Sequence, residues 1–261
     1  MQRARKRFGQ HFLHDPAVIG RIVTALDVRA GEHLVEIGPG RGALTHELLR
    51  RTDCSFDAIE IDRDLAQRLR GEFQDAPRCE LHEADALDFD FAALANRRGG
   101  RLRIIGNLPY NISTPLLFHL LGQMQAIQDL HVMLQREVVT RLAASPGTRD
   151  FGRLTLMVAP YLAVEKLFDI GPGAFQPPPK VWSAVVHLTV RAQPLFPVSP
   201  HYPAVVAAAF AHRRKTLRNA LAQLLSREEI SACGVDPAAR PETLDAQQFN
   251  ALAQTLDRAR G

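Results

Sequence analysis

Cysteine is scarce in this chain, and long apolar runs are missing. Cys54, Cys79 and Cys233 are the three cysteines among 261 residues. Their wide spacing fits neither a disulfide framework nor a metal site, so we expect no disulfide, no metal and a reducing compartment, the cytoplasm. The longest apolar runs, "LTLMVAPYLAV" and "VVAAAFA", fall short of the roughly 20 residues of a membrane helix. No apolar segment follows the basic "MQRARKRFGQ", so we expect neither a secretory signal nor a membrane partner.

The composition is that of an ordinary globular protein with a basic bias. Hydrophobic residues make up 46% and charged residues 23% of the chain, and the net charge is +4. The length allows one sizeable core and a small appendage. Basic residues gather in "RARKR" (3–7) and "HRRKTLR" (212–218), near opposite ends of the chain. Each run is either a solvated surface or a contact for a polyanion.

Strand and helix patterns alternate through the first two thirds of the chain. Residues 15–28 predict an amphipathic helix capped by Asp15, with Pro16 in its first turn. Apolar segments then predict strands at 33–38, 56–61, 79–85, 101–108 and 129–134. Helical patterns at 42–51, 63–73, from Ser113, and at 136–144 separate most of them. This order predicts an α/β fold with a mostly parallel sheet and helices on both faces.

The residue at the end of each of four strands is of a type that binds ligands. These residues are Gly38, Glu60, Asp85 and Asn107. Ligands of open α/β sheets bind beyond the carboxyl ends of the strands. We therefore expect these four residues to meet in one site.

The composition and the hydrophobic pattern of the sequence change after a last predicted strand at 181–190. "RAQPLFPVSPHYP" contains four prolines and is typical of a linker, and only short helical patterns follow it. We predict two domains, residues 1–190 and residues 191–261, the second small and all-helical.

The segment "VEIGPGRGALT" (35–45) predicts a ligand-binding turn between a strand and a helix. Gly38, Gly40 and Gly42 allow a tight turn and close approach to a ligand at the helix N-terminus. Gly38, Gly40 and Ala43 also satisfy the dinucleotide fingerprint, with Glu60 placed for ribose hydroxyls. The loop by itself therefore leaves NAD and S-adenosylmethionine open, and a purely structural turn is a third interpretation.

Two carboxylates favour S-adenosylmethionine. Glu36, just before the loop, suits a cationic sulfonium amino acid better than a pyrophosphate. Asp85 follows the third strand, where it can meet an adenine amine, although an aspartate in a solvated turn is a common alternative.

The stretch "IIGNLPYNIS" (104–113) predicts chemistry on an adenine amine. That amine is a poor nucleophile, and its reactivity rises when both N–H groups donate to fixed acceptors. The Asn107 side chain and the Leu108 carbonyl can supply these acceptors, Pro109 fixes the backbone, and Tyr110 can stack on the base. The alternative is a strand end, a proline turn and a core tyrosine.

Five segments in order carry a family resemblance: "RFGQHFL" (7–13), "VEIGPGRGALT", "NLPYNIS", "GAFQPPPKVWSAVV" (173–186) and "FAHRRKTLRNAL" (210–221). The chain resembles the ribosomal RNA adenine N6,N6-dimethyltransferases, and within them the bacterial enzymes that act on small-subunit (16S) rRNA. The resemblance implies a Rossmann-like class I methyltransferase core with an all-helical C-terminal domain. It also implies dimethylation of two adjacent adenosines in the 3′-terminal hairpin loop of 16S rRNA during small-subunit biogenesis, with S-adenosylmethionine as cofactor.

The resemblance assigns roles residue by residue. It implies that Phe175 stacks on the target base opposite Tyr110; the alternative is a core phenylalanine supported by Pro177–Pro179. His11 stands where many relatives have asparagine, which leaves the role of its side chain open. The expected catalytic residues are Asn107, Leu108, Pro109, Tyr110 and Phe175. The expected cofactor-binding residues are His11, Leu13, Gly38, Gly40, Glu60, Asp85 and Asn107.

The basic run at 212–218 is then interpreted as an RNA surface. Arg213, Arg214, Lys215 and Arg218 lie at helical spacing and could bind phosphates without reading sequence. The expected partner is 16S rRNA within the small subunit or its precursor, bound by a monomer. A DNA adenine N6-methyltransferase and a non-catalytic small-subunit assembly factor are the alternatives.

Overall fold

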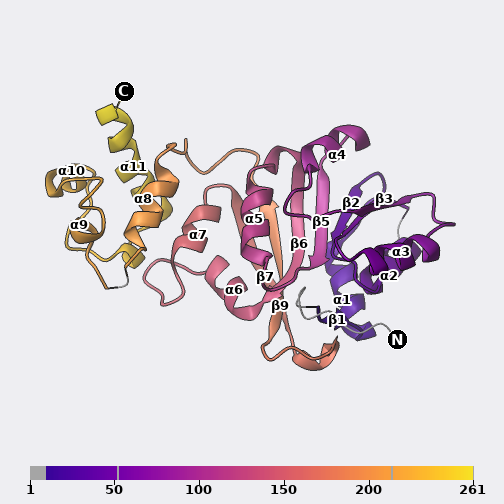
Figure 1. Ribbon diagram of the computed structural model, residues 1–261. Helices are drawn as coiled ribbons and strands as arrows, with labels where there is room; N and C mark the ends of the chain where they lie inside the picture. The colour runs from indigo at the N-terminus through magenta and orange to yellow at the C-terminus, as the bar shows by residue number, and fades with distance from the viewer. Residues whose placement is uncertain (1–9, 52, 213, 261) are drawn as a thin grey trace. The chain divides into compact units, whose positions relative to one another are not determined.

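The computed structural model describes residues 10–51, 53–212 and 214–260 (Figure 1). The chain forms two compact units. The first comprises the residues up to 139 together with 165–190, and the second comprises 140–164 together with the residues from 191 onward. Over these residues, no helix has both the length and the apolar character needed to cross a bilayer.

A seven-stranded sheet forms the centre of the first unit. Its strand order is β4-β3-β2-β5-β6-β9-β7. The pairs among β2, β3, β4, β5 and β6 are parallel, and β9 runs antiparallel to β6. The strands are β2 (His33–Ile37), β3 (Ser55–Glu60), β4 (Cys79–Glu83), β5 (Leu102–Asn107), β6 (Ile127–Gln135), β7 (Leu162–Ile170) and β9 (Ser183–Val190). The predicted α/β class is confirmed, and β7 is a strand that no pattern had indicated.

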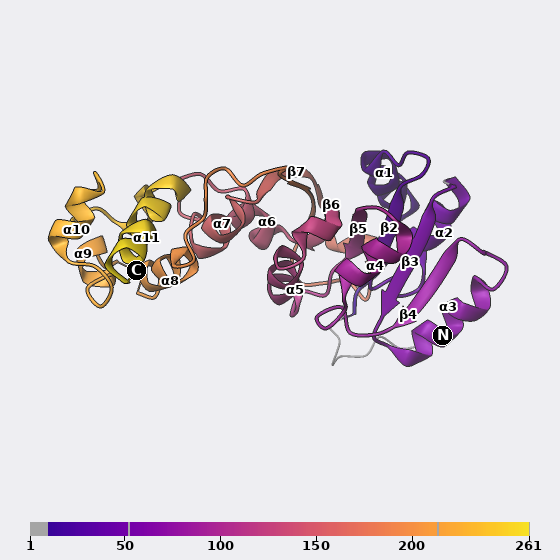
Figure 2. The same ribbon diagram turned by 90° about the horizontal axis from the view of Figure 1, so that it is seen from above.

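Helices cover both faces of this sheet. Buried leucines of α1 and α2 share one apolar core with alternate side chains of β2 and β3, and Figure 2 shows α5 on the opposite side of the sheet. The helices of this part of the chain are α1 (Pro16–Leu26), α2 (Ala43–Arg51), α3 (Arg63–Glu72), α4 (Phe91–Arg98), α5 (Ser113–Leu121), the short 3-10 helix η2 (Met124–Ala126) and α6 (Arg136–Leu142). Asp15 caps α1 through the amides of Ala17 and Val18, as its sequence predicted.

A two-stranded sheet joins the start of the described chain to the segment before β9. β1 (Phe12–Leu13) pairs antiparallel with β8 (Phe175–Gln176), which follows the 3-10 helix η3 (Pro172–Ala174). Leu13 is the register partner of Phe175, and both side chains are buried in the core of the first unit. This pairing places the backbone of residues 10–13 next to the carboxyl ends of the central strands, where it lines the cavity described below.

The second unit has a helical core of its own. Its helices are α7 (Arg153–Val158), α8 (Tyr202–Ala209), α9 (Leu217–Ala220), α10 (Arg227–Ala232), the 3-10 helix η4 (Pro241–Thr243) and α11 (Ala246–Arg260). Phe151 and Leu156 belong to the same buried cluster as Tyr202 and Phe249. The Tyr202 hydroxyl donates to the Leu156 carbonyl at 2.9 Å, and the Gly147 amide donates to the Glu242 carbonyl at 2.7 Å.

These contacts change the domain division expected from the sequence. The division before residue 191 agrees with the structure, but residues 140–164 belong to the second unit instead of the first. No sequence pattern indicated this, because the segment returns to the sheet through β7 and its apolar side chains contact their partners only in the folded chain. The C-terminal domain therefore includes an insertion from the middle of the chain.

Candidate active site

One cavity lies at the carboxyl ends of the central parallel strands. Strands β2, β3 and β5 contribute their last residues to its wall, and the loop after β4 contributes residues 84–86. Ten residues predicted from the sequence line this cavity: His11, Leu13, Gly38, Gly40, Glu60, Asp85, Asn107, Leu108, Pro109 and Tyr110. The four strand-end residues Gly38, Glu60, Asp85 and Asn107 therefore meet at one cavity, as expected.

The loop between β2 and α2 turns through glycines in the left-handed region. Gly38, Gly40 and Gly42 have φ angles of 69°, 60° and 78°, which side-chain-bearing residues rarely adopt. A Cβ atom on Gly40 would also lie 3.1 Å from the Phe12 ring. The loop can thus approach a ligand closely, and it is fixed against β1 on its other side.

Glu60 ends β3 with its carboxylate held in place by backbone amides. One oxygen accepts from the Gly40 amide at 3.0 Å and the other from the Asp62 amide at 2.9 Å. Burial raises the pKa of this carboxyl above its usual range, and the two amide bonds oppose that effect. A carboxylate offers about four acceptor positions, so those not taken by the amides can accept hydroxyl groups of a ligand.

The two other predicted carboxylates differ in burial. Glu36 is 1% exposed and accepts a hydrogen bond from the Thr45 hydroxyl at 2.6 Å. Burial raises its pKa to about 7, so near neutral pH it is divided between its protonated and charged forms. Asp85 is half-buried and accepts from the Leu87 amide at 2.9 Å. Both line the cavity, Asp85 as the more accessible acceptor.

Asn107 is oriented by the segment that precedes β1. Its Nδ2 atom donates to the His11 carbonyl at 2.8 Å. Because a carbonyl can only accept, the amide must present its nitrogen there, and Oδ1 is the end that can accept from a ligand. Just before Asn107, Gly106 has a φ of 157°, and a Cβ atom there would lie 2.4 Å from the Ile37 carbonyl oxygen. Glycine at 106 therefore allows β5 to approach β2 where the site begins.

Tyr110 and His11 form one side of the cavity. The Tyr110 hydroxyl shares a 2.7 Å hydrogen bond with Ser183, and burial raises its pKa. The ring centroids of His11 and Tyr110 are 5.8 Å apart and tilted by 30°. Nδ1 of His11 donates to the Pro177 carbonyl at 2.8 Å. The His11 side chain thus holds the β8 segment, while its backbone carbonyl positions Asn107.

Phe175 does not join this site. We expected its ring opposite Tyr110, but it is 2% exposed, belongs to the apolar core with Leu13 and Ile170, and does not line the cavity. The alternative interpretation, a core phenylalanine, describes the structure. Pairing of β8 with β1 turns this side chain inward.

Ile61 is a cavity residue that the sequence analysis missed. It directly follows Glu60, lines the cavity and is 47% exposed, although large apolar side chains are usually buried. The sequence offered one signal for Ile61, namely its position directly after Glu60, the acidic residue that ends β3. An exposed apolar side chain beside a carboxylate with free acceptor positions suits the face of a purine.

The basic residues near 213–218 are not arranged as predicted. Arg213 and the run at 3–7 lie outside the described residues. Arg214, Lys215 and Arg218 are exposed, but α9 begins only at Leu217, and Arg214 has a φ of 75°. That angle is incompatible with a right-handed helix, so these cations lie on a turn and the following helix instead of along one helical face.

The cavity has the groups that S-adenosylmethionine requires. Glu60 and Asp85 provide acceptors for ribose hydroxyls and an adenine amine, Ile61 provides an apolar surface, and the glycine loop allows close approach. Glu36 and Glu60 are carboxylates on the same wall, which disfavours the pyrophosphate of a dinucleotide.

Comparison with known proteins supports this interpretation. Residues 1–258 match the family model described as ribosomal RNA adenine dimethylase. The chain is 55% identical over 256 residues to ribosomal RNA small subunit methyltransferase A of Pseudomonas aeruginosa, covering 97% of this chain and 95% of the relative. It is 54% identical to the protein of that name from Nitrosococcus oceani, covering 97% and 96%.

Two solved structures share the architecture. The 23S rRNA methyltransferase ErmE superposes with a TM-score of 0.71 at 28% identity, covering 94% of this chain and 99% of ErmE. A dimethyladenosine transferase from Plasmodium falciparum superposes with a TM-score of 0.77 at 23% identity, covering 95% and 98%, which supports the fold. Sequence and structure agree over nearly the whole chain. The chain belongs to the ribosomal RNA adenine dimethylase family.

Proposed function

We propose that this protein uses S-adenosylmethionine to dimethylate the N6 amines of two adjacent adenosines in the 3′-terminal hairpin loop of small-subunit (16S) rRNA. The observation that carries the proposal is the fixed amide of Asn107. Its nitrogen is bonded to the His11 carbonyl, so its oxygen is the acceptor at the mouth of a cavity suited to the cofactor. Family membership and the names of the relatives favour rRNA as the substrate.

The residues of the chain would act on the adenine amine by accepting its two N–H groups. S-adenosylmethionine supplies an electrophilic methyl group when it is bound. Asn107 Oδ1 and the Leu108 carbonyl accept one N–H each, which directs the nitrogen lone pair out of the ring plane. These hydrogen bonds strengthen as positive charge develops on the nitrogen, and they therefore stabilise the transition state more than the ground state.

Tyr110 and Pro109 would hold the target base and the acceptors in place. Stacking on the Tyr110 ring repays part of the cost of removing the base from its stack in RNA. The bond between Tyr110 and Ser183 fixes the ring orientation. Pro109 has no N–H and a restricted φ, which keeps the adjacent Leu108 carbonyl in position. No strong general base is needed, because the amine proton becomes acidic once the nitrogen is methylated.

Cofactor binding would fall to other residues that line the cavity. Glu60 accepts the ribose hydroxyls, Asp85 accepts the adenine amine, and Ile61 packs against the purine face. Gly38, Gly40, Leu13 and His11 shape the remaining surface. The exposed cations Arg214, Lys215 and Arg218 of the second unit contact RNA phosphates and contribute affinity without reading sequence. We place this activity in the cytoplasm, with the small subunit or its precursor as partner.

One assay tests the proposal. The protein is mixed with labelled S-adenosylmethionine and either small subunits lacking the modification or duplex DNA, and the nucleic acid is then digested to nucleosides. We expect labelled dimethyladenosine from the small subunits and none from the DNA. Label in DNA would instead indicate a DNA adenine methyltransferase, and binding to subunits without transfer would indicate an assembly factor.

A further inference from the structure

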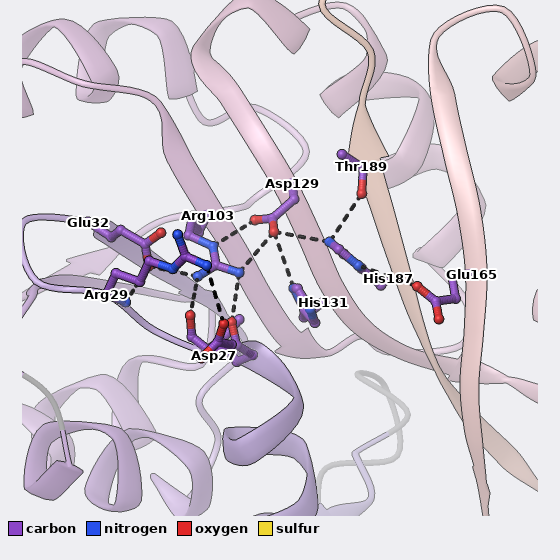
Figure 3. A network of polar contacts seen from close by, with 10 residues as sticks. Asp27, Arg29, Glu32, Arg103, Asp129, His131, Glu165, His187 and Thr189 are labelled. Carbon is purple, nitrogen blue, oxygen red and sulfur yellow. Dashed lines mark hydrogen bonds and ion pairs between the residues drawn. The ribbon is translucent and has the colours of Figure 1, made fainter.

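A buried polar network lies across β5, β6 and β9 in the first unit (Figure 3). Arg103 donates two hydrogen bonds to Asp129, at 3.0 and 2.9 Å, and one to Glu32 at 2.7 Å. His131 and His187 both lie next to Asp129 in space, and Glu165 lies on the far side of His187. The adenine site uses none of these side chains.

The two histidines face each other across the antiparallel pair of β6 and β9. They are direct register partners, and their rings stack with centroids 3.9 Å apart and planes 22° apart. Nδ1 of His131 lies 3.6 Å from Oδ2 of Asp129, and Nε2 of His187 lies 3.1 Å from the same oxygen. Two imidazole nitrogens and one carboxylate oxygen therefore converge, all within 4.8 Å of one another.

One of these nitrogens is an unsatisfied buried acceptor. His131 is 4% exposed, and among the described residues its Nδ1 has no hydrogen-bond partner. Nδ1 is therefore a free lone pair whenever Nε2 carries the ring proton. A lone pair that lies 3.6 Å from a carboxylate oxygen is unfavourable, and a cation bound between the two atoms would satisfy both.

We propose that Asp129, His131 and His187 form a site for a divalent transition-metal ion of the Zn²⁺ type, bound through Nδ1 of His131, Nε2 of His187 and Oδ2 of Asp129. Imidazole and carboxylate donors suit such ions, and a solvent molecule would complete a tetrahedral shell. Metal–ligand bonds of about 2.0–2.2 Å are shorter than the present gaps allow, so the three side chains close slightly around the ion.

The atoms beyond the three ligands match this assignment. A metal-binding histidine usually donates its other ring N–H to a carboxylate or a backbone carbonyl. Nδ1 of His187 lies 4.0 Å from a Glu165 oxygen, which places a carboxylate beside that ring nitrogen. When the ion binds, the proton of His187 moves from Nε2 to Nδ1 through solvent and then faces Glu165. Arg103 holds the carboxylate of Asp129 in place.

The charge balance and an access route also permit a cation. Three carboxylates, those of Glu32, Asp129 and Glu165, face one guanidinium, that of Arg103. The set therefore has a negative excess before any ion binds. The His187 side chain is 24% exposed, which provides a path from solvent. The sequence patterns indicated no metal, because the two histidines of this site lie on strands far apart in the chain.

A second cluster offers an internal comparison. Asp57, Glu80 and His82 also lie close together. There, Nε2 of His82 donates to Asp57 at 2.7 Å, and Arg98 donates twice to the same carboxylate. The described residues satisfy these atoms with two arginines, Arg97 and Arg98, around one buried aspartate. This cluster is a set of ion pairs, and His82 is a matched control for the proposed site.

The test uses the full-length protein, stripped with a chelator and titrated with Zn²⁺ against a chromophoric competitor. We expect one site whose affinity falls at least about 100-fold in His187→Gln and about 10-fold in Glu165→Gln, because Glu165 acts only beyond the ligands. The same site should bind Co²⁺ with the absorption of a tetrahedral complex, lost in His187→Gln. His82→Gln should leave both readouts unchanged.

Thermal unfolding gives a second measurement. Saturating Zn²⁺ should raise the Tm of the wild-type protein and of His82→Gln, and should not raise that of His187→Gln, because an ion that binds only the folded state stabilises it. Glu165 has a mostly exposed side chain, so its variant tests the site without disturbing the core. No tight site, or a site equally strong in His187→Gln, would overturn the proposal.

Discussion

The two units of this chain differ in whether they bury charged side chains. Among the residues that the structure describes, the first buries six charged residues and one histidine: Glu36, Asp57, Glu60, Asp62, Arg103, Asp129 and His131. In the described part of the second unit, the buried polar residues are Thr155, Ser199 and Asn250, all neutral. Removing a charge from water is costly unless specific partners compensate.

This difference separates two tasks. In the first unit, the buried carboxylate of Glu60 and the half-buried amide of Asn107 are held by backbone groups at strand ends, where a ligand needs acceptors in fixed positions. In the second, cations such as Arg214 and Lys215 remain in solvent, where they can meet a polyanion and respond to salt. We infer that chemistry depends on fixed buried groups and that RNA affinity depends on exposed ones. Four experiments test this division.

Asn107→Ala should have the largest effect. It removes one of the two acceptors proposed for the adenine amine, and we expect the single-turnover rate of methyl transfer to fall about 100- to 1000-fold. Binding to small subunits should change less than about twofold. The exposed Asn96→Ala on α4 is the matched control and should keep both values. Loss of binding in parallel with activity would contradict the separation of tasks.

Glu36→Gln should change how stability depends on pH. The folded-state pKa of about 7 lies above the unfolded value of 4.5, so the folded state binds more protons between these values. The free energy of unfolding contributed by Glu36 therefore falls as pH rises from 4.5 to 7 and is constant above 7. Relative to wild type, the variant should gain up to about 3 kcal/mol at about pH 8 and little at about pH 4.5.

Urea denaturation of both proteins across this pH range measures the Glu36 effect. The glutamine is isosteric and can still accept from Thr45, so packing is retained. If the free energy of unfolding depended on pH in the same way in both proteins, Glu36 would not titrate with a raised pKa in the folded state. Glu36 would then no longer count among the buried charges that distinguish the first unit.

Gly106→Ala should destabilise the first unit by about 2 kcal/mol or more, because the new Cβ would collide with the Ile37 carbonyl at a φ that favours glycine. Gly71→Ala lies on α3, where a Cβ meets nothing within 4 Å, and should be neutral or slightly stabilising. Chemical denaturation compares the two. A tolerated Gly106→Ala would mean that close approach of β5 and β2 is not required.

The triple variant Arg214→Ala, Lys215→Ala, Arg218→Ala should have the smallest effect. We expect affinity for small-subunit RNA to fall about tenfold, and the slope of log K against log salt to become shallower by about two. Methyl transfer at saturating RNA should keep the wild-type rate. Arg240→Ala, elsewhere on the second unit, is the control. An unchanged salt slope would place the RNA surface on other residues.

Local patterns predicted most of the first unit. Asp15 caps a helix as expected, since capping depends on residues within one turn. Strands β2, β3 and β5 lie within a few residues of their predicted bounds, because buried apolar runs between helices leave few alternatives. The same patterns missed α4 and β7, and they assigned residues 140–164 to the wrong unit, because the partners of these segments are distant in sequence.

Sequence patterns were sufficient to predict the family, the parallel sheet and the meeting of four strand-end residues, because parallel strands carry their carboxyl-end residues to one edge. These residues are Gly38, Glu60, Asp85 and Asn107. The folded chain was needed to learn which way the Asn107 amide faces, that Phe175 is buried, and that His131 lies against His187. Each of these depends on a partner far along the chain. Such partners meet only when β1 pairs with β8 and β6 with β9.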